Sequence, residues 1–155
     1  MATFRFEPKV DLDRADIVDC ALGAAAGEAW GSNDIGKLVC LEAGSADANY
    51  KAIDSTNEIN GFIVSVEPFT VNDGFKFGSI QRNGRVWVVN ADAGALAVGD
   101  YVVGAAQTVA VGTAGKSKVK KPADAAAFAA LGFKWRVIRL ASNGAVGTEV
   151  LIERV

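Results

Sequence analysis

The chain of 155 residues carries 16 basic and 18 acidic side chains, and its formal net charge of −2 is too small to gather nucleic acid or an anionic membrane. It contains no histidine, which excludes a Ser-His or Cys-His nucleophile, a histidine base and histidine-ligated zinc. Half of the residues are hydrophobic, and 17 glycines against 3 prolines accompany abundant Ala and Val, a balance that favours short strands and tight turns over long helices.

The N-terminal segment 3–7 alternates apolar and polar residues before Pro8 interrupts it. This pattern is typical of a short edge strand or of an extended arm, and it can pair with the chain's own sheet or with a neighbour's. The next segment, 17–30, is rich in Ala and Gly, and its repeated glycines argue against a helix. We therefore interpret it as a strand or loop with weak local preference.

Two short apolar segments follow, each bounded by turn residues. Residues 37–42 lie between Gly36 and a Gly-containing turn, and residues 61–67 end at Pro68. Such bounded runs are typical of buried strands. The stretch between them is polar and rich in turn-forming residues.

The clearest local signal lies in segment 75–89, where Asn83 and Gly84 stand between two apolar runs. Asn-Gly is the dipeptide that a type I′ turn prefers, because both central residues of that turn need a positive φ. The segment therefore predicts a β-hairpin centred on these two residues.

Strand signals continue towards the C-terminus in segments 96–103, 108–111, 133–137 and 148–155. One segment, Pro122 to Leu131, is predicted to be helical. Proline suits a first helical turn, Asp124 places negative charge near the N-terminus of the helix, alanine dominates, and Gly132 can end it.

The spacing of the strand candidates, about 8 to 15 residues with turn signals throughout, points to a sandwich or a small barrel. We predict a mainly β fold of one domain over residues 1–155, with one short helix and a candidate extended arm at residues 1–10. The domain is expected to be a β-barrel or a jelly-roll-like β-sandwich. The sequence shows no convincing internal repeat and no linker that would divide the chain.

The hydropathy pattern indicates a compartment. No apolar run approaches the roughly 20 residues needed to cross a bilayer, and the first residues lack the apolar stretch of a signal peptide. We therefore expect a protein made and kept in a cytosol. There the two cysteines, Cys20 and Cys40, are expected to be small buried hydrophobic residues and not a disulfide.

A cluster of carboxylates near the N-terminus resembles part of a calcium loop. The Gly and the terminal Glu of an EF-hand loop are missing at the needed offsets, and Arg14 sits inside the cluster. We favour a solvated turn over a metal site. The carboxylates are Asp11, Asp13, Asp16 and Asp19.

Residues 31–38 match most of the phosphate-binding P-loop motif, because they have its GxxxxGK spacing. Leu38, however, occupies the position of the hydroxyl that holds magnesium, and a strand is expected where the motif requires a helix N-terminus. We therefore favour a turn that leads into a buried strand over a nucleotide site.

One basic cluster stands out, and its partial alternation predicts a strand with lysines on the solvated face. Such a strand could contact an acidic surface or phosphates. We favour a charged sheet edge that prevents unwanted strand pairing, because no aromatic residues interleave with the lysines. The cluster consists of Lys116, Lys118, Lys120 and Lys121, and the three tryptophans, Trp30, Trp87 and Trp135, are expected in the core.

In style and order over most of its length, the sequence resembles the small head decoration, or cement, proteins of tailed bacteriophages. The resemblance is carried by the leading arm 3–10, the Ala/Gly-rich segment 20–27, the phrase Glu-Ile-Asn-Gly-Phe-Ile at 58–63, and Gly-Arg-Val-Trp-Val at 84–88. It is also carried by Ala-Gly-Ala-Leu-Ala-Val-Gly-Asp-Tyr-Val at 93–102, which in such proteins introduces a strand after a Gly-Asp turn.

The sequence offers no plausible active site, so we expect a protein that binds another protein and is not an enzyme. The resemblance implies a structural protein of the virion. Such a protein is made in the host cytoplasm, binds the exterior of an icosahedral shell of major capsid protein, and clamps neighbouring capsomers together. The resemblance also implies a β-barrel, jelly roll or related fold that acts as a dimer or trimer. From the small net charge and the incomplete metal and nucleotide motifs we expect no cofactor, metal, nucleic acid or membrane partner. A clamp of this kind needs a rigid scaffold and flexible edges, and many weak copies act together through multivalency.

Within this framework we expect Phe4, Arg5 and Phe6 to contact the major capsid protein. An alternating Phe-x-Phe arm can extend a partner's sheet while its aromatic side chains act as anchors. The alternative is an ordinary first strand in the chain's own sheet, and the periodicity fits both equally well.

Two other functions stay open. A tail or fibre-associated β module would need the same scaffold as a capsid protein. A carbohydrate-binding or carbohydrate-active β-sandwich could use carboxylates such as Glu67 or Asp73 near the strand ends, and it would need two carboxyl groups that face one another across a deep cleft.

Overall fold

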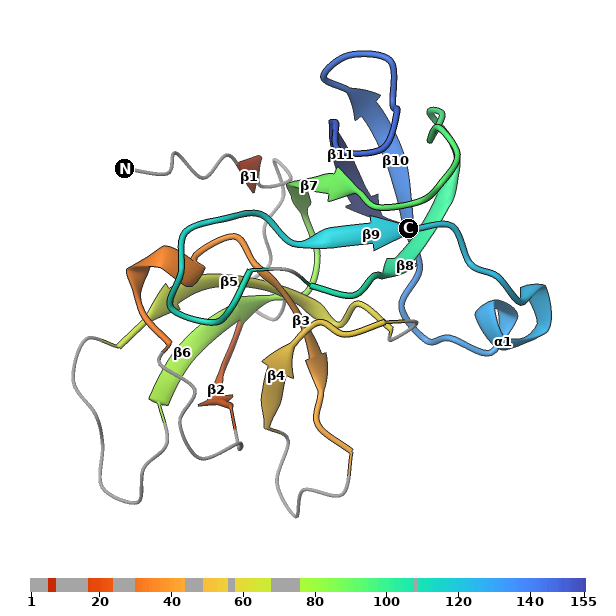
Figure 1. The fold of residues 1–155 in the computed structure, drawn as a ribbon. Helices are drawn as coiled ribbons and strands as arrows, with labels where there is room; N and C mark the ends of the chain where they lie inside the picture. Colours follow the sequence, from red (N-terminus) through yellow and green to blue (C-terminus); the bar gives the residue numbers. More distant parts are fainter. Residues whose placement is uncertain are drawn as a thin grey trace.

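The computed structural model describes residues 6–7, 17–23, 30–43, 49–55, 58–67, 76–107 and 109–155 (Figure 1). Within these ranges the chain is mainly β, with one short 3₁₀ turn, η2 (Ser32–Asp34), and one short helix, α1 (Ala125–Ala129). The strands are β1 (Phe6–Glu7), β2 (Ile17–Leu22), β3 (Leu38–Leu41), β4 (Tyr50–Ala52), β5 (Gly61–Val66), β6 (Lys76–Gln81), β7 (Arg85–Asn90), β8 (Tyr101–Gly104), β9 (Lys118–Lys120), β10 (Trp135–Leu140) and β11 (Glu149–Arg154).

The first barrel is a closed ring in the order β2-β4-β3-β5-β6. Its longest ladder joins β2 to β6, from Ile17 opposite Gln81 to Leu22 opposite Lys76. Strand closure removes the free edges that would otherwise invite aggregation. A buried cluster belongs to this barrel and consists of Leu22, Trp30, Val39, Tyr50, Ile63 and Ile80.

The second barrel is formed by β7, β11, β10, β8 and β9, and a parallel pairing of β9 with β7 closes it. Strand β7 alternates along its length, with Val86, Val88 and Asn90 buried and the residues between them half-buried. This period of two is the reason the segment forms a strand with one face in the core. Strand β1 adds to the outside of this ring by pairing with the start of β7.

Both parts of the chain share one core. The larger buried cluster joins residues of the second barrel to Leu38, Cys40 and Phe62 of the first. At its centre, Trp135 is fully buried, meets the Phe62 ring edge-on at 6.4 Å between centroids, and donates from Nε1 to the carbonyl oxygen of Ile59 at 2.8 Å. The barrels are therefore held together by apolar packing and by a buried hydrogen bond.

The predicted mainly β fold with one short helix is confirmed, and of the two architectures left open the chain adopts the barrel. The helix begins later than the sequence suggested. Asp124 is its N-cap, accepting hydrogen bonds from the backbone nitrogens of Ala126 and Ala127, so Pro122 precedes the helix. The predicted strand 108–111 is wrong where it is described, because residues 109–111 form a bend and turn.

The hairpin predicted around Asn83 and Gly84 is wrong, although both strands exist. Within the described residues β6 pairs with β2 and β5, whereas β7 pairs with β1, β9 and β11. Because each strand already has partners on both sides, the Asn-Gly turn joins one barrel to the other. Gly84 has a φ of 148° there, and the side chain of the buried Gln81 donates to the Asn83 carbonyl oxygen at 2.6 Å.

The two barrels have the same topology. In each, the first strand pairs in parallel with the third, and antiparallel pairs join third to second, second to fourth, fourth to fifth and fifth to first. Both also shift register in the fourth strand, between Ile63 and Ser65 in β5 and between Val137 and Arg139 in β10. The expectation that the chain has no internal repeat is therefore wrong at the level of its topology.

Equivalent backbone hydrogen bonds set the register between the repeats. The Gly36 nitrogen donates to the Ile63 carbonyl at 2.7 Å, and the Gly99 nitrogen donates to the Val137 carbonyl at 2.7 Å. Both glycines have a positive φ, 87° and 97°, a conformation that favours glycine over residues with a Cβ. The ladders extend the match around both rings, so that Val39 corresponds to Val102.

Gly104 lies where the two barrels touch, and it supplies a test of their contact. A Cβ at this position would collide with the Asp54 carbonyl oxygen and lie 2.5 Å from Cγ1 of Ile53. We expect Gly104→Ala to lower the free energy of unfolding by about 1 to 3 kcal/mol, because overpacking moves the barrels apart. Chemical denaturation followed by circular dichroism measures this loss.

The matched control for Gly104→Ala is Gly94→Ala. A Cβ on Gly94 meets nothing within 4 Å, so this substitution should change the free energy of unfolding by less than about 0.5 kcal/mol. Equal effects of the two substitutions would contradict the close approach of the barrels at Gly104.

Candidate functional site

The segment predicted to contact a partner lies at the outer edge of the second barrel. Phe6 and Glu7 form β1 and pair with Val86 and Arg85 of β7, in the chain's own sheet. Phe4 and Arg5 lie outside the described residues. From Val89 onwards the same edge of β7 pairs with β9. An added strand at this edge can therefore pair only with the start of β7, where β1 pairs in this structure.

The P-loop-like segment forms a buried ion pair. The Asp34 carboxylate has no exposure, and its Oδ1 lies 2.7 Å from Nζ of Lys37. It also accepts hydrogen bonds from the backbone nitrogens of Gly31 at 2.8 Å and Gly112 at 2.9 Å. Both oxygens of this buried carboxylate therefore accept hydrogen bonds from groups of the chain itself.

The lysine that a P-loop would aim at phosphate has other partners here. Nζ of Lys37 donates to Asp34, to the Ala110 carbonyl at 2.9 Å and to the Thr113 carbonyl at 2.8 Å. An ammonium group has three donors, and these three bonds use them all. Residues 31–38 therefore fasten the loop 109–115 of the second barrel onto the first, which agrees with the structural interpretation of the motif.

The basic cluster lies on and beside β9, as the alternation predicted. Val119 is buried, whereas Lys118 and Lys120 are half-buried on the other face of the strand. The interpretation of this strand as a protective sheet edge is wrong, because β9 pairs with both β7 and β8 and closes the second barrel. Lys116 lies 2.5 Å from a carboxylate oxygen of Glu149, so part of the cluster's charge is compensated within the chain.

Two aspartates near this cluster have lowered pKa values. Backbone hydrogen bonds from Lys121 and Gly94 lower the pKa of Asp92, against a smaller desolvation penalty. At Asp100 desolvation raises the pKa, but the backbone hydrogen bond from Ala97 and the ion pair with Lys121, 2.9 Å away, outweigh it and leave the pKa lowered. Both carboxylates hold turns in place, and their environment favours the charged form.

The other candidate carboxylates are only partly described. Asp19 accepts a hydrogen bond from the Ser79 hydroxyl at 2.5 Å in β2, and Asp11, Asp13 and Asp16 lie outside the described residues. In the described part of the chain no group of three or more potential metal ligands occurs. Glu67 is exposed just after β5, and Asp73 lies outside the described residues.

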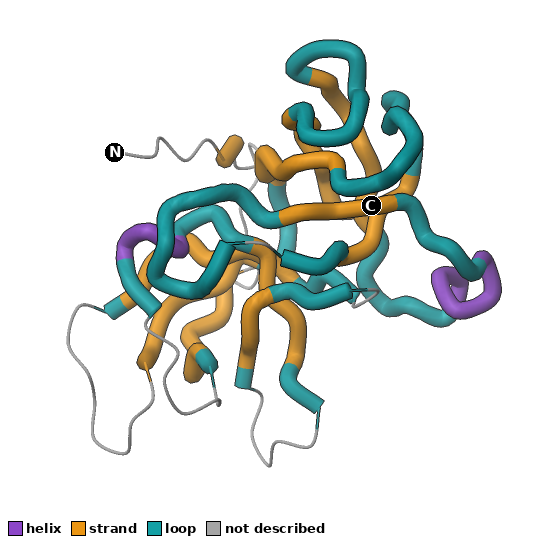
Figure 2. Tube along the Cα trace, in the orientation of Figure 1, coloured by secondary structure: helices purple, strands orange, loops and turns teal. Residues whose placement is uncertain are grey.

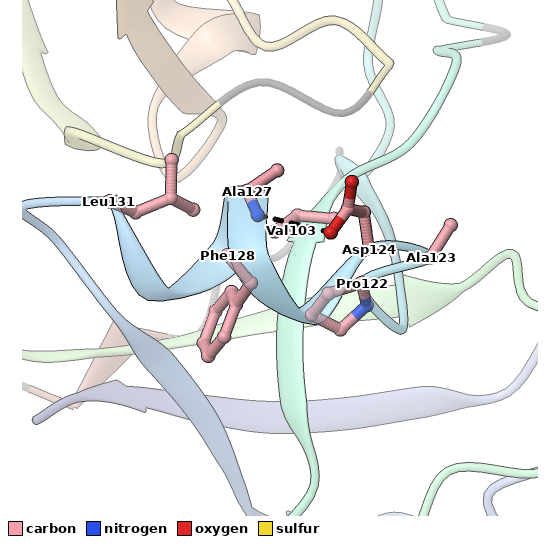
Figure 3. A pocket seen from close by; sticks show the side chains of 7 residues that line it. All are labelled: Val103, Pro122, Ala123, Asp124, Ala127, Phe128 and Leu131. Carbon is pink, nitrogen blue, oxygen red and sulfur yellow. Dashed lines mark hydrogen bonds between the residues drawn. The ribbon is translucent and has the colours of Figure 1, made fainter.

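A pocket that the sequence did not indicate lies between β8 and α1 (Figure 3). It has a volume of about 280 Å³. The side chains from α1 and from the turn before it surround the position of Val103 on β8. Its lining residues are Val103, Pro122, Ala123, Asp124, Ala127, Phe128 and Leu131.

The pocket is built for apolar contact. Its one charged lining residue, Asp124, uses Oδ1 to accept from the backbone nitrogens of Ala126 and Ala127, at 2.8 and 3.1 Å. Phe128 packs against the ring of Tyr101, with centroids 5.2 Å apart. The pocket can therefore receive an aliphatic side chain, whereas none of its side chains is placed for acid-base or nucleophilic chemistry.

Helix α1 itself is unusual because it is apolar and has no buried residue. It lies at the side of the molecule opposite the 3₁₀ turn in the view of Figure 2. The sequence carried a signal for this: residues 125–130 are five alanines and one phenylalanine with no polar face, and an apolar helix without a polar face normally packs against something.

The comparisons with known proteins leave the family open. No protein-family model and no curated protein matches this chain. No helix in the described ranges is long and apolar enough to span a membrane.

Proposed function

We propose that this chain is a structural protein that binds the exterior of an icosahedral phage shell and stabilises contacts between major capsid protein subunits. On this proposal the chain is made in the host cytoplasm, is not an enzyme, and acts as an oligomer on the virion. The partner is inferred from the resemblance to head decoration proteins of tailed bacteriophages.

The observation that carries the proposal is how β1 attaches to the rest of the chain. It is held through two residue pairs at the start of β7, on the outside of an otherwise closed barrel. A strand this short contributes little to the stability of its own sheet, so the N-terminal segment can exchange its own barrel for the sheet of a partner. Strand addition then supplies backbone hydrogen bonds, and Phe4 and Phe6 supply the apolar anchors.

The rest of the molecule supports a scaffold role. The two barrels share a core and are fastened by the buried Asp34–Lys37 pair, which holds the turn of one barrel to a loop of the other. Such a body keeps its shape on binding. Rigid copies that each bind weakly can hold a shell together through their number.

Deletion of residues 2–8 tests the proposal. We expect the deleted chain to bind expanded capsids of the source particle about 30-fold more weakly than the full chain, because loss of an aromatic anchor costs about 2 kcal/mol or more. Co-sedimentation measures occupancy, and circular dichroism checks that the barrels still fold. Undiminished occupancy of a folded deletion variant would reject the arm, and a full chain that never binds the shell would reject the function.

A second variant separates the anchors from the backbone pairing. Phe4→Ser combined with Phe6→Ser keeps the length of the arm, and it should weaken binding nearly as much as the deletion if the aromatic side chains are the anchors. Arg5→Ser, at the position between the two phenylalanines, is the matched control. It should weaken binding less, because a charged residue at the rim of an interface contributes little to affinity.

A further inference from the structure

The internal repeat shows which face of each barrel is used for packing. The outer face of β3 in the first barrel, with Leu38 and Cys40, is buried against the second barrel. By the shared register, Tyr101 and Val103 are the equivalent residues on β8. Val103 is buried, whereas Tyr101 is 43% exposed and packs against Phe128 of α1, so the face that the first barrel buries against its neighbour is only partly covered in the second barrel.

The pocket lies on this same face. By the same register, Pro122 after β9 corresponds to Ile53 after β4. Pro122 lines the pocket together with Val103. The connection from β9 to β10 is longer than its counterpart from β4 to β5, and the extra length contains α1. The second barrel therefore carries an apolar helix and a pocket at the position where the first barrel carries its neighbour.

The contact inside the chain also indicates what could fill the pocket. Gly104, at the end of β8, approaches Ile53 of the first barrel so closely that a Cβ there would lie 2.5 Å from the Ile53 side chain. The residue equivalent to Gly104 in the first barrel is Leu41, at the end of β3. Leu41 is 46% exposed, which leaves a large apolar side chain in solvent at the equivalent contact position.

We propose that a second copy of this chain docks on the face formed by β8 and α1, with its Leu41 inserted into the pocket lined by Val103, Pro122 and Phe128. The contact repeats between chains the packing that the two barrels make within one chain. The contact within the chain has no room for a side chain, because the backbone at Gly104 closely approaches Ile53. The contact between chains has a pocket of about 280 Å³, and the larger side chain of Leu41 fits there in place of glycine.

This contact is heterologous, because each copy offers one Leu41 and one pocket on different barrels. Contacts of this kind produce rings when the rotation closes and open chains when it does not. The inference does not depend on a capsid, so self-association of the purified full chain can be measured apart from the binding of a shell.

Two exposed positions supply the variants. Leu41→Asp removes the inserting side chain, and Ala127→Trp fills the pocket; both residues are exposed, so both variants should fold. We expect each change to weaken self-association by about tenfold or more in sedimentation equilibrium, since a charge or a blocked pocket at the centre of an interface removes its main anchor. Val146→Asp, at another position that is 60% exposed, is the control and should leave self-association unchanged.

A mixture of the two variants is the decisive measurement. The Leu41→Asp chain keeps its pocket and the Ala127→Trp chain keeps its leucine, so each pair can form one intact contact and no further one. We expect the mixture to contain 1:1 dimers, whereas each variant alone stays monomeric at the same concentration.

Three results would overturn the proposal: a monomeric unsubstituted chain at concentrations up to about 1 mM, a mixture that stays monomeric, or variants that associate normally. A monomeric chain that loses shell binding on Ala127→Trp would assign this face to the shell protein and would likewise overturn docking of a second copy.

Discussion

Replacing Asp34 with alanine is expected to lower the free energy of unfolding by about 3 to 5 kcal/mol, because it leaves the buried ammonium of Lys37 without its counter-charge. The carboxylate has no exposure and accepts from the backbone nitrogens of Gly31 and Gly112 as well as from Lys37. Its loss therefore unfastens the loop of the second barrel from the turn of the first. Urea denaturation followed by circular dichroism measures the change.

Two further variants test whether the pair acts as a unit. Lys37→Met should be as costly as Asp34→Ala, and the double variant should cost less than the sum of the two, because neither buried charge is then left alone. Lys121→Met is the surface control: its ion pair with Asp100 has a lysine side chain that is 44% exposed, and such pairs contribute about 1 kcal/mol or less. Losses below about 1 kcal/mol for both buried variants would show that the pair does not fasten the barrels.

The same residues explain why a motif misleads when it is taken from spacing alone. The GxxxxGK spacing at 31–38 predicts a phosphate cradle only if the chain continues into a helix, and the apolar run after Lys37 indicated a strand instead. That much could be predicted. The partners of Lys37 could not, because the Ala110 and Thr113 carbonyls are more than seventy residues away along the chain, and local patterns carry no information on such contacts.

The hairpin around Gly84 failed for a related reason. The dipeptide Asn83-Gly84 and its flanking apolar runs predicted two strands and a type I′ turn; both strands are present, and residues 82–84 between them form a bend. Turn chemistry cannot tell whether the two strands pair with each other. Here β6 and β7 each pair with strands of their own barrel, so the segment between them connects the two barrels. Tertiary packing therefore overrides the local preference for a hairpin.

The internal repeat was hidden because topology is conserved between the barrels while side chains are not. Gly36 and Gly99 match because their turns require a positive φ. Asp34 and Ala97 occupy equivalent positions and have no chemistry in common, since Asp34 holds the loop 109–115 of the second barrel through the Gly112 nitrogen. Likewise α1 could be predicted as a helix from its alanines, but its exposure follows from the face of the barrel on which it lies.

Replacing Trp135 with alanine is expected to cost about 3 to 5 kcal/mol of unfolding free energy, the range for deleting a large buried side chain. Trp135 is fully buried in the cluster that both barrels share, where it packs against Phe62 and donates a hydrogen bond to the Ile59 carbonyl. The substitution opens a cavity at the junction and removes a buried hydrogen bond. Thermal and urea unfolding followed by circular dichroism both measure this loss.

Phenylalanine substitutions separate the hydrogen bond from the packing. Trp135→Phe keeps most of the ring but leaves the Ile59 carbonyl without its donor, at a cost of about 1 to 3 kcal/mol beyond the lost volume. Trp30→Phe is the matched control in the core of the first barrel, because the Trp30 Nε1 is buried without a hydrogen-bond partner among the described residues. Trp135→Phe should therefore be the more destabilising of the two, and equal losses would mean that packing alone joins the barrels at this point.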